Sequence, residues 1–178
     1  MRLATALAIA ILSALPASAQ PDTSLVVPGV RVGPVALGMD ADAARAAAAR
    51  FERETGCTID IAIAADRVIA AGTRFGGCLS LELPADARPA VVQAGTFLLP
   101  LAAGIGGPAA ALVNAFGQPR VTPLGGDQAA LVWPQGLAAH VGGVSHMGGI
   151  VTYLAVVALG TREAPRIGHF ASGTPPSP

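Results

Sequence analysis

The stretch DADAARAAAARFERETGCTIDIAIA, residues 40–64, decides the fold because it changes from helical spacing to strand alternation around one glycine. Asp40 suits the N-cap of a helix, and Asp42 lies in the first turn, where the helix dipole favours an anion. Gly56 provides the left-handed conformation that commonly ends a helix. These signals predict one amphipathic helix that leads directly into a β-strand.

The predicted helix has one smooth face that can approach a sheet closely. Its arginines lie toward the C-terminal end, where the helix dipole favours cations. The residues of the smooth face, which follow helical spacing, are Ala44, Ala47, Ala48, Phe51 and Thr55.

Apolar residues alternate along the chain after this helix, as in half-buried strands. The predicted strands cover Ile59 to Ile63, Val68 to Gly72 and Leu79 to Leu83. A β-prone segment with glycine breaks precedes the helix. We therefore expect a first helix-plus-meander unit over residues 29–88, with residues 20–28 as a lead-in.

The same order of elements recurs in residues 89–163. A short helix is predicted from Pro108, which suits a first helical turn, to Phe116. Strands are predicted at Ala130–Trp133, Leu137–Val144 and Ile150–Leu159. We expect an α+β fold with short helices packed on an antiparallel β-meander sheet, in two similar units. Residues 164–178 are expected to form a flexible tail.

In outline, most of the chain after residue 19 resembles a known kind of tandem repeat. The resemblance is carried by an apolar entry with glycines, a short helix, Gly117-Gln118-Pro119, and the run LVWPQGLAAHV from Leu131. It is similar to the helix-plus-meander repeats of the BamE (SmpA/OmlA) and β-lactamase-inhibitory-protein type. This resemblance implies a non-catalytic, protein-binding role. The chain differs from BamE in having no lipid-attachment Cys after its N-terminal apolar stretch.

Residues 1–19 predict a cleavable secretory signal. Arg2 precedes an uncharged apolar stretch, from Leu3 to Leu15, that is too short for a stable membrane anchor. Ala17-Ser18-Ala19 places small residues at the positions that signal peptidase requires. We expect a periplasmic or secreted protein.

Composition narrows the class of partner. The chain has 11 basic and 11 acidic residues, and such neutrality argues against nucleic acid or anionic membrane as a main partner. No charged residue occurs from Pro89 to Pro119, so a membrane span is an alternative there. Its apolar runs are broken by Pro100 and several glycines and fall short of the roughly 20 residues that a span needs. We expect no stable membrane anchor.

Cys57 and Cys78 are the only cysteines, and an exported chain reaches an oxidising compartment. A structural disulfide is the preferred interpretation, with free thiols and redox catalysis as the alternatives. Strict alternation places Cys78 with Ser80 and Cys57 with the isoleucines. The bridge therefore requires Cys57 to lie in the turn between helix and strand.

The three histidines offer weak support for a metal site, because no Cys or carboxylate cluster lies near them in the sequence. We expect no metal and no cofactor. Trp133 is interpreted as a core residue, with surface recognition as the alternative. The candidate binding surface consists of Arg74, Phe75, Trp133, His140, His146 and Tyr153.

The preferred function is a non-catalytic binding or adaptor module for another envelope protein, because no coherent acid–base, nucleophile or metal set is present. One alternative is a periplasmic hydrolase or small-ligand-binding protein, with a site assembled from distant residues such as Ser80, Asp127, His140 and His146. Another is an inhibitor of an extracytoplasmic enzyme. The sequence leaves the oligomeric state open.

Overall fold

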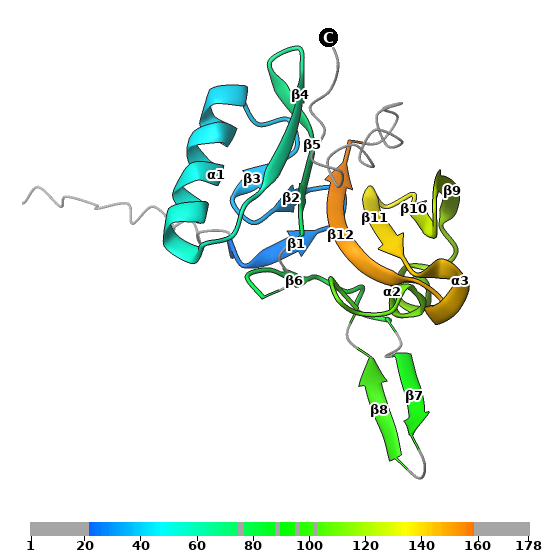
Figure 1. Cartoon of the computed structure of the whole chain (residues 1–178). Helices are drawn as coiled ribbons and strands as arrows, with labels where there is room; N and C mark the ends of the chain where they lie inside the picture. The colour runs from blue at the N-terminus through cyan, green and yellow to red at the C-terminus, as the bar shows by residue number, and fades with distance from the viewer. Residues whose placement is uncertain (1–21, 75–76, 88–89, 95–96, 102, 159–178) are drawn as a thin grey trace, which may run out of the picture.

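The protein is described by a computed structural model over residues 22–74, 77–87, 90–94, 97–101 and 103–158. The predicted signal segment, residues 1–19, and the predicted tail, residues 164–178, lie outside the described residues. In chain order the elements are β1 (Leu25–Val27), β2 (Arg31–Val32), β3 (Val35–Ala36), α1 (Ala41–Thr55), β4 (Asp60–Ala64), β5 (Arg67–Thr73), β6 (Ser80–Leu81), β7 (Ala90–Ala94), β8 (Phe97–Leu101), α2 (Ala109–Phe116), β9 (Arg120–Gly125), β10 (Gln128–Val132), β11 (Leu137–Gly142), α3 (Val144–Met147) and β12 (Ile150–Val157) (Figure 1).

Helix α1 has the ends that its sequence predicts. The Asp40 side chain accepts hydrogen bonds from the backbone N–H groups of Asp42 and Ala43, at 3.0 and 3.2 Å. Gly56 has a φ of 76° and donates its N–H to the carbonyl of Glu52, which ends the helix. Both predicted caps of this helix are therefore confirmed.

Six strands form one antiparallel sheet in the order β4-β5-β12-β11-β10-β9. Strands from both predicted units join in this sheet, with β12 between β5 and β11. The expectation of an α+β fold with an antiparallel sheet is confirmed. The two predicted units do not form separate sheets, because β12 hydrogen-bonds along β5, with Val156 opposite Ala71.

The third predicted strand of the first unit does not continue the meander. Its residues Ser80 and Leu81 form β6, which pairs in parallel with β1 at the edge of a four-stranded sheet, β3-β2-β1-β6. Ser80 and Glu82 are exposed, which suits an edge position. The place beside β5 goes to β12, whose apolar residues are buried on both faces of the sheet.

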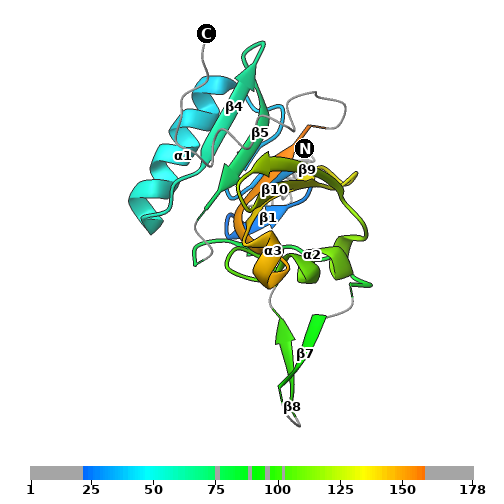
Figure 2. The same cartoon turned by 45° about the vertical axis from the view of Figure 1, so that its right-hand side comes forward.

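Both long helices cover the same face of the six-stranded sheet (Figures 1 and 2). One core cluster joins α1 to Val156 of β12, and a second joins α2 to Leu154 of the same strand. Residues two apart on a strand share a face, so the two clusters lie side by side. Tyr153, Ala155 and Val157 are buried on the opposite face.

Several elements have no counterpart in the predictions, namely β1, α3, β9 and the hairpin of β7 with β8. Strand β9 extends the sheet beyond β10, and β7 pairs with β8 as a separate two-stranded hairpin. The hairpin projects away from the body in both views (Figures 1 and 2). Within the described residues, no helix is long and apolar enough to cross a membrane.

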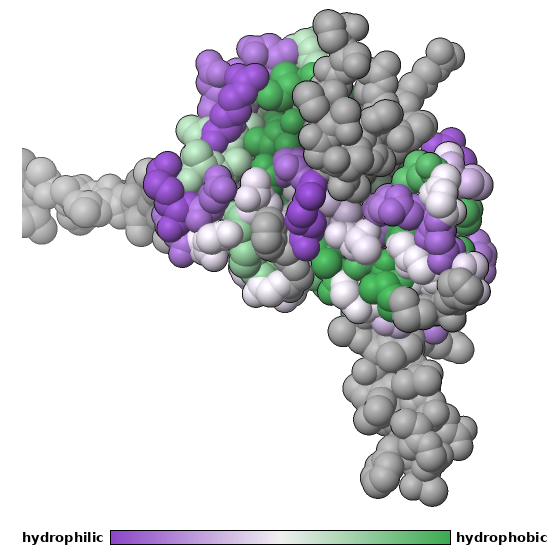
Figure 3. All heavy atoms as spheres, viewed as in Figure 1, coloured by the Kyte–Doolittle hydropathy of each residue, from purple (hydrophilic) through white to green (hydrophobic). Residues whose placement is uncertain are grey.

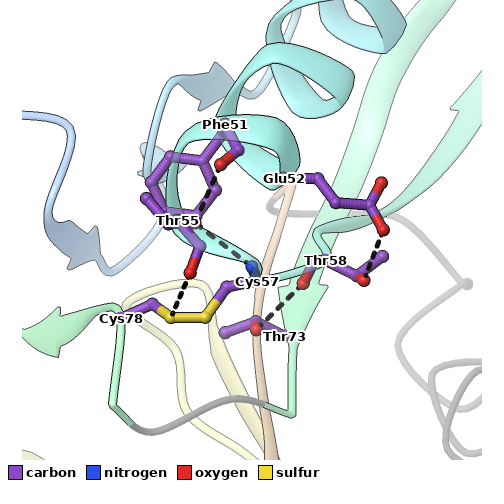
Figure 4. Close-up of a disulfide and its surroundings, with 7 residues drawn as sticks. All are labelled: Phe51, Glu52, Thr55, Cys57, Thr58, Thr73 and Cys78. Atoms are coloured by element: carbon purple, nitrogen blue, oxygen red, sulfur yellow. Dashed lines mark hydrogen bonds between the residues drawn. A yellow bond between two sulfur atoms is a disulfide. The ribbon is translucent and has the colours of Figure 1, made fainter.

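The predicted disulfide between Cys57 and Cys78 is present, with Cα atoms 6.3 Å apart (Figure 4). Cys57 lies between the end of α1 and the start of β4, which is the turn position that the bridge was expected to require. The Thr55 hydroxyl donates to the Phe51 carbonyl at 2.8 Å and accepts the N–H of Cys57 at 3.2 Å. The bridge therefore ties an ordered helix end to the segment before β6.

Candidate functional site

Trp133 lies in the core beneath α2 and is 1 % exposed. Its indole N–H donates to the Gly117 carbonyl at 2.7 Å, and its ring lies 6.3 Å from that of Phe116. Tyr153 and His140, at 2 % and 7 % exposed, are buried as well. These three candidate residues therefore do not form an exposed recognition surface in this structure.

The other candidate binding residues are spread over the chain. Arg74 is exposed at the end of β5, and its guanidinium lies 3.8 Å from the Asp60 carboxylate. The pairing of β4 with β5 places Asp60 opposite Gly72, which lies two residues before Arg74 in the sequence. Phe75 and the side chain of His146 lie outside the described residues.

A cluster of polar side chains lies on the sheet face opposite the helices, where Asp60 interacts with both Tyr153 and Arg74. Gly72 is needed beside Tyr153, because a Cβ there would lie 2.2 Å from the tyrosine oxygen. Burial raises the pKa of Asp60, against the opposing effects of the Arg74 charge and a hydrogen bond from Tyr153. Burial, reinforced by the Asp60 charge, raises the pKa of Tyr153, which therefore stays protonated and donates.

His140 occupies the same face at an irregularity in the pairing of β11 with β12. The register passes from His140 opposite Tyr153 to Val141 opposite Val151, which leaves Thr152 as the extra residue. The Thr152 hydroxyl lies 2.7 Å from His140 Nδ1 and donates to the His140 carbonyl at 3.2 Å. Sequence patterns did not identify Thr152 or Asp60, because their partners come from distant strands.

Burial lowers the pKa of His140 below its ordinary value of 6.5, which favours the neutral imidazole in the folded protein. The unfolded chain therefore binds a proton at pH values where the folded chain does not. The stability that depends on neutral His140 is fully present above the pKa that this residue has in the unfolded chain. It is lost as the pH falls through the lower pKa that His140 has in the folded chain.

His140→Asn is expected to make stability less dependent on pH. Urea unfolding at about pH 7.5 and about pH 5 should show a smaller loss on acidification in the variant than in the unsubstituted chain. Comparing the two chains at each pH cancels the contributions of Asp60 and the other carboxylates. An equal loss in both chains would show that His140 does not couple its protonation to folding.

The described residues named for a hydrolase site lie on different elements or turns and make separate contacts. Ser80 pairs with Leu25 in the four-stranded sheet, and the Asp127 carboxylate accepts the backbone N–H of Ser145 at 2.7 Å. The His140 side chain is hydrogen-bonded to the Thr152 hydroxyl. Across the described ranges, no group of three His, Cys, Asp or Glu residues is placed to hold a metal ion.

An open groove of about 360 Å³ lies between α2, α3 and the outer strands β9 and β10. Its lining contains no charged residue and is mostly apolar. Val121 of β9 is 57 % exposed and Val144 of α3 is 43 % exposed. On the face drawn in Figure 3, hydrophobic residues also reach the surface near the lower bend of β12. The groove residues are Ala109, Ala110, Val113, Asn114, Gln118, Pro119, Val121, Ala129, Leu131, Val141, Val144 and Gly148.

The edge strand beside this groove is interrupted. Strand β9 pairs with β10 on one side only and contains Pro123, which has no backbone N–H. A proline on an edge strand disfavours the addition of another strand. The groove is therefore suited to receive apolar side chains more than to extend the sheet.

Comparison with known proteins gives no relative from which a function could be transferred. No protein-family model, no curated protein and no solved structure matches this chain. Its function is therefore inferred from the groove and from the chemistry of its own side chains.

Proposed function

We propose that this protein is an exported, non-catalytic binding module of the bacterial envelope. Its docking surface is the uncharged groove between α2, α3 and β9–β10. The partner is another envelope protein, which binds there through an uncharged, apolar segment. The observation that carries the proposal is the groove itself, which is open, mostly apolar and bordered by the exposed Val121 and Val144.

The composition of the groove supports a protein partner. The cores of protein interfaces are apolar and depleted in charged residues, as this lining is. Small exposed residues, including Ala110 and Gly148, allow a partner to approach the backbone of α2 and of the segment after α3. Pro123 disfavours strand addition, so side chains of the partner enter the groove while its backbone remains outside.

Two further considerations favour binding over catalysis. The polar groups of the opposite face are engaged with one another, through Tyr153 with Asp60 and His140 with Thr152. The resemblance to BamE-type repeats implies the same kind of non-catalytic role, and the predicted signal segment places that role in the periplasm or outside the cell.

Val121→Glu tests the groove. Capture of the envelope partner by the tagged chain, after crosslinking in intact cells, is expected to fall at least about tenfold, because a carboxylate would have to be desolvated in an apolar contact. Val30→Glu is the matched control, since Val30 is 51 % exposed beside β2 and does not line the groove. The control should keep full capture.

Three outcomes would contradict this proposal: recovery of the chain alone, equal capture by both variants, or equal loss in both. A thermal shift produced by an apolar small molecule and abolished by Val121→Glu, without any protein capture, would instead favour a ligand-binding protein. The groove volume lies near the lower end of the range for small-molecule sites, about 300–1,000 Å³.

A further inference from the structure

The β7–β8 hairpin is separate from both larger sheets. Its strands pair in full register, from Ala90 opposite Leu101 to Ala94 opposite Phe97, and among the described residues they pair only with each other. Both views show the hairpin extending away from the body beyond α2 (Figures 1 and 2). An isolated two-stranded hairpin is at best marginally stable in water. β7 also lies near α2, and a third strand would further stabilise this hairpin (Ala90–Ala94 and Phe97–Leu101), called the arm below.

The two outer edges of this arm differ in a way that selects one for pairing. Natural sheets protect their edges with charged residues or proline. Strand β7, AVVQA, contains neither. Strand β8, FLLPL, contains Pro100, which cannot donate a backbone hydrogen bond. The edge of β7 is thus the open one, and the edge of β8 is interrupted.

A strand of another protein chain can hydrogen-bond to the backbone groups at the edge of β7, which a lipid bilayer cannot do. The arm has no charged residue, and apolar residues occupy neighbouring positions of both strands, such as Val91 and Val92 or Leu98 and Leu99. Hydrocarbon would cover the apolar residues but would leave the edge N–H and C=O groups without partners. Pairing with a strand supplies those partners.

We propose that β7 pairs with β7 of a second copy, antiparallel about a two-fold axis, to form a four-stranded sheet across the dimer. A register centred on Val92 pairs all five residues of the strand, with Ala90 opposite Ala94 of the second copy and Val91 opposite Gln93. No like charges face each other in this register. Pro100 interrupts both outer edges, so the assembly closes at two copies.

Val92→Lys tests this pairing, because it places two like charges directly opposite each other across the two-fold axis. The full chain, purified after export, is expected to sediment as a dimer. The variant should raise the dimer dissociation constant at least about 100-fold. Leu99→Lys is the matched control, since Leu99 pairs with Val92 within the hairpin and lies one strand farther from the axis. The control should remain dimeric.

Val92→Cys tests the register without weakening the contact. Mild oxidation should join two copies through position 92, whereas Leu99→Cys should stay unjoined. A monomer at all concentrations, a dimer insensitive to Val92→Lys, or joining through position 99 instead would overturn the proposal. Flotation with neutral phosphatidylcholine vesicles, reduced equally by both lysine variants, would also overturn it and would identify the arm as a membrane contact.

Discussion

Trp133→Ala is expected to lower the free energy of unfolding by about 3–5 kcal/mol, the range found for removing a buried aromatic side chain. The ring is 1 % exposed and packs in the same core cluster as Leu112 and Phe116 of α2, so its removal is expected to leave a cavity there. The substitution also leaves the Gly117 carbonyl without its 2.7 Å hydrogen bond. Urea unfolding followed by far-UV circular dichroism measures the loss, since Trp133 is the only tryptophan.

Trp133→Phe separates the two contributions. It keeps an aromatic ring near Phe116 and removes the indole N–H, so the expected loss is about 1–3 kcal/mol. A loss below about 1 kcal/mol for the alanine variant would contradict the core position and would restore Trp133 as a surface residue. Because the same core supports the wall of the groove through Leu131, partner capture should weaken together with stability.

Replacing Cys57 and Cys78 together by serine is expected to cost about 3 kcal/mol of stability. The bridge spans 21 positions and restricts the unfolded chain, while it ties the end of α1 to the segment before β6. β6 lies at the edge of its sheet, so the four-stranded sheet should lose order first. Urea unfolding of the oxidised chain and the double variant gives the difference.

The reduced, unsubstituted chain is the control for this pair, and it should unfold at the same urea concentration as the double variant. The oxidised chain, denatured without reductant, should take up no alkylating reagent. Alkylation of both thiols in that sample would show that the bridge does not form. Equal stability of the oxidised and reduced chains would contradict the stabilising role of the bridge.

Local signals in the sequence were sufficient for α1 and for the position of Cys57. The Asp40 and Gly56 caps act on backbone groups within one turn of helix, so they operate whatever the rest of the chain does. The alternating isoleucines similarly predicted β4, which the structure has at Asp60–Ala64. The pairing of the two cysteines followed from their number and from the predicted compartment.

Local sequence signals did not show which strands pair with one another. An antiparallel edge can be filled by any apolar strand, and Leu79–Leu83 has as clear an alternation as the strand that displaced it. The structure places β12 beside β5 because β12 buries apolar residues on both faces, whereas Ser80 and Glu82 remain exposed. Strand β9 was missed because Pro123 and Gly125 weaken the strand pattern.

The candidate site depended on tertiary structure almost entirely. The groove combines residues of α2, α3, β9 and β10, and no spacing along the chain connects Val121 with Val144. The preferred interpretation of Trp133 as a core residue is confirmed, whereas His140 and Tyr153, also named for a binding surface, are buried in the folded chain.

By itself the sequence determined the capped helix α1, the alternating strands and the cysteine pair, since each depends on residues close in the chain or on a single pair. Only the tertiary structure decided that both halves share one six-stranded sheet, that Tyr153 meets Asp60 over Gly72, and that an uncharged groove opens beside α2. These features arise from contacts between distant segments, whose choice depends on which arrangement buries the most apolar surface at once.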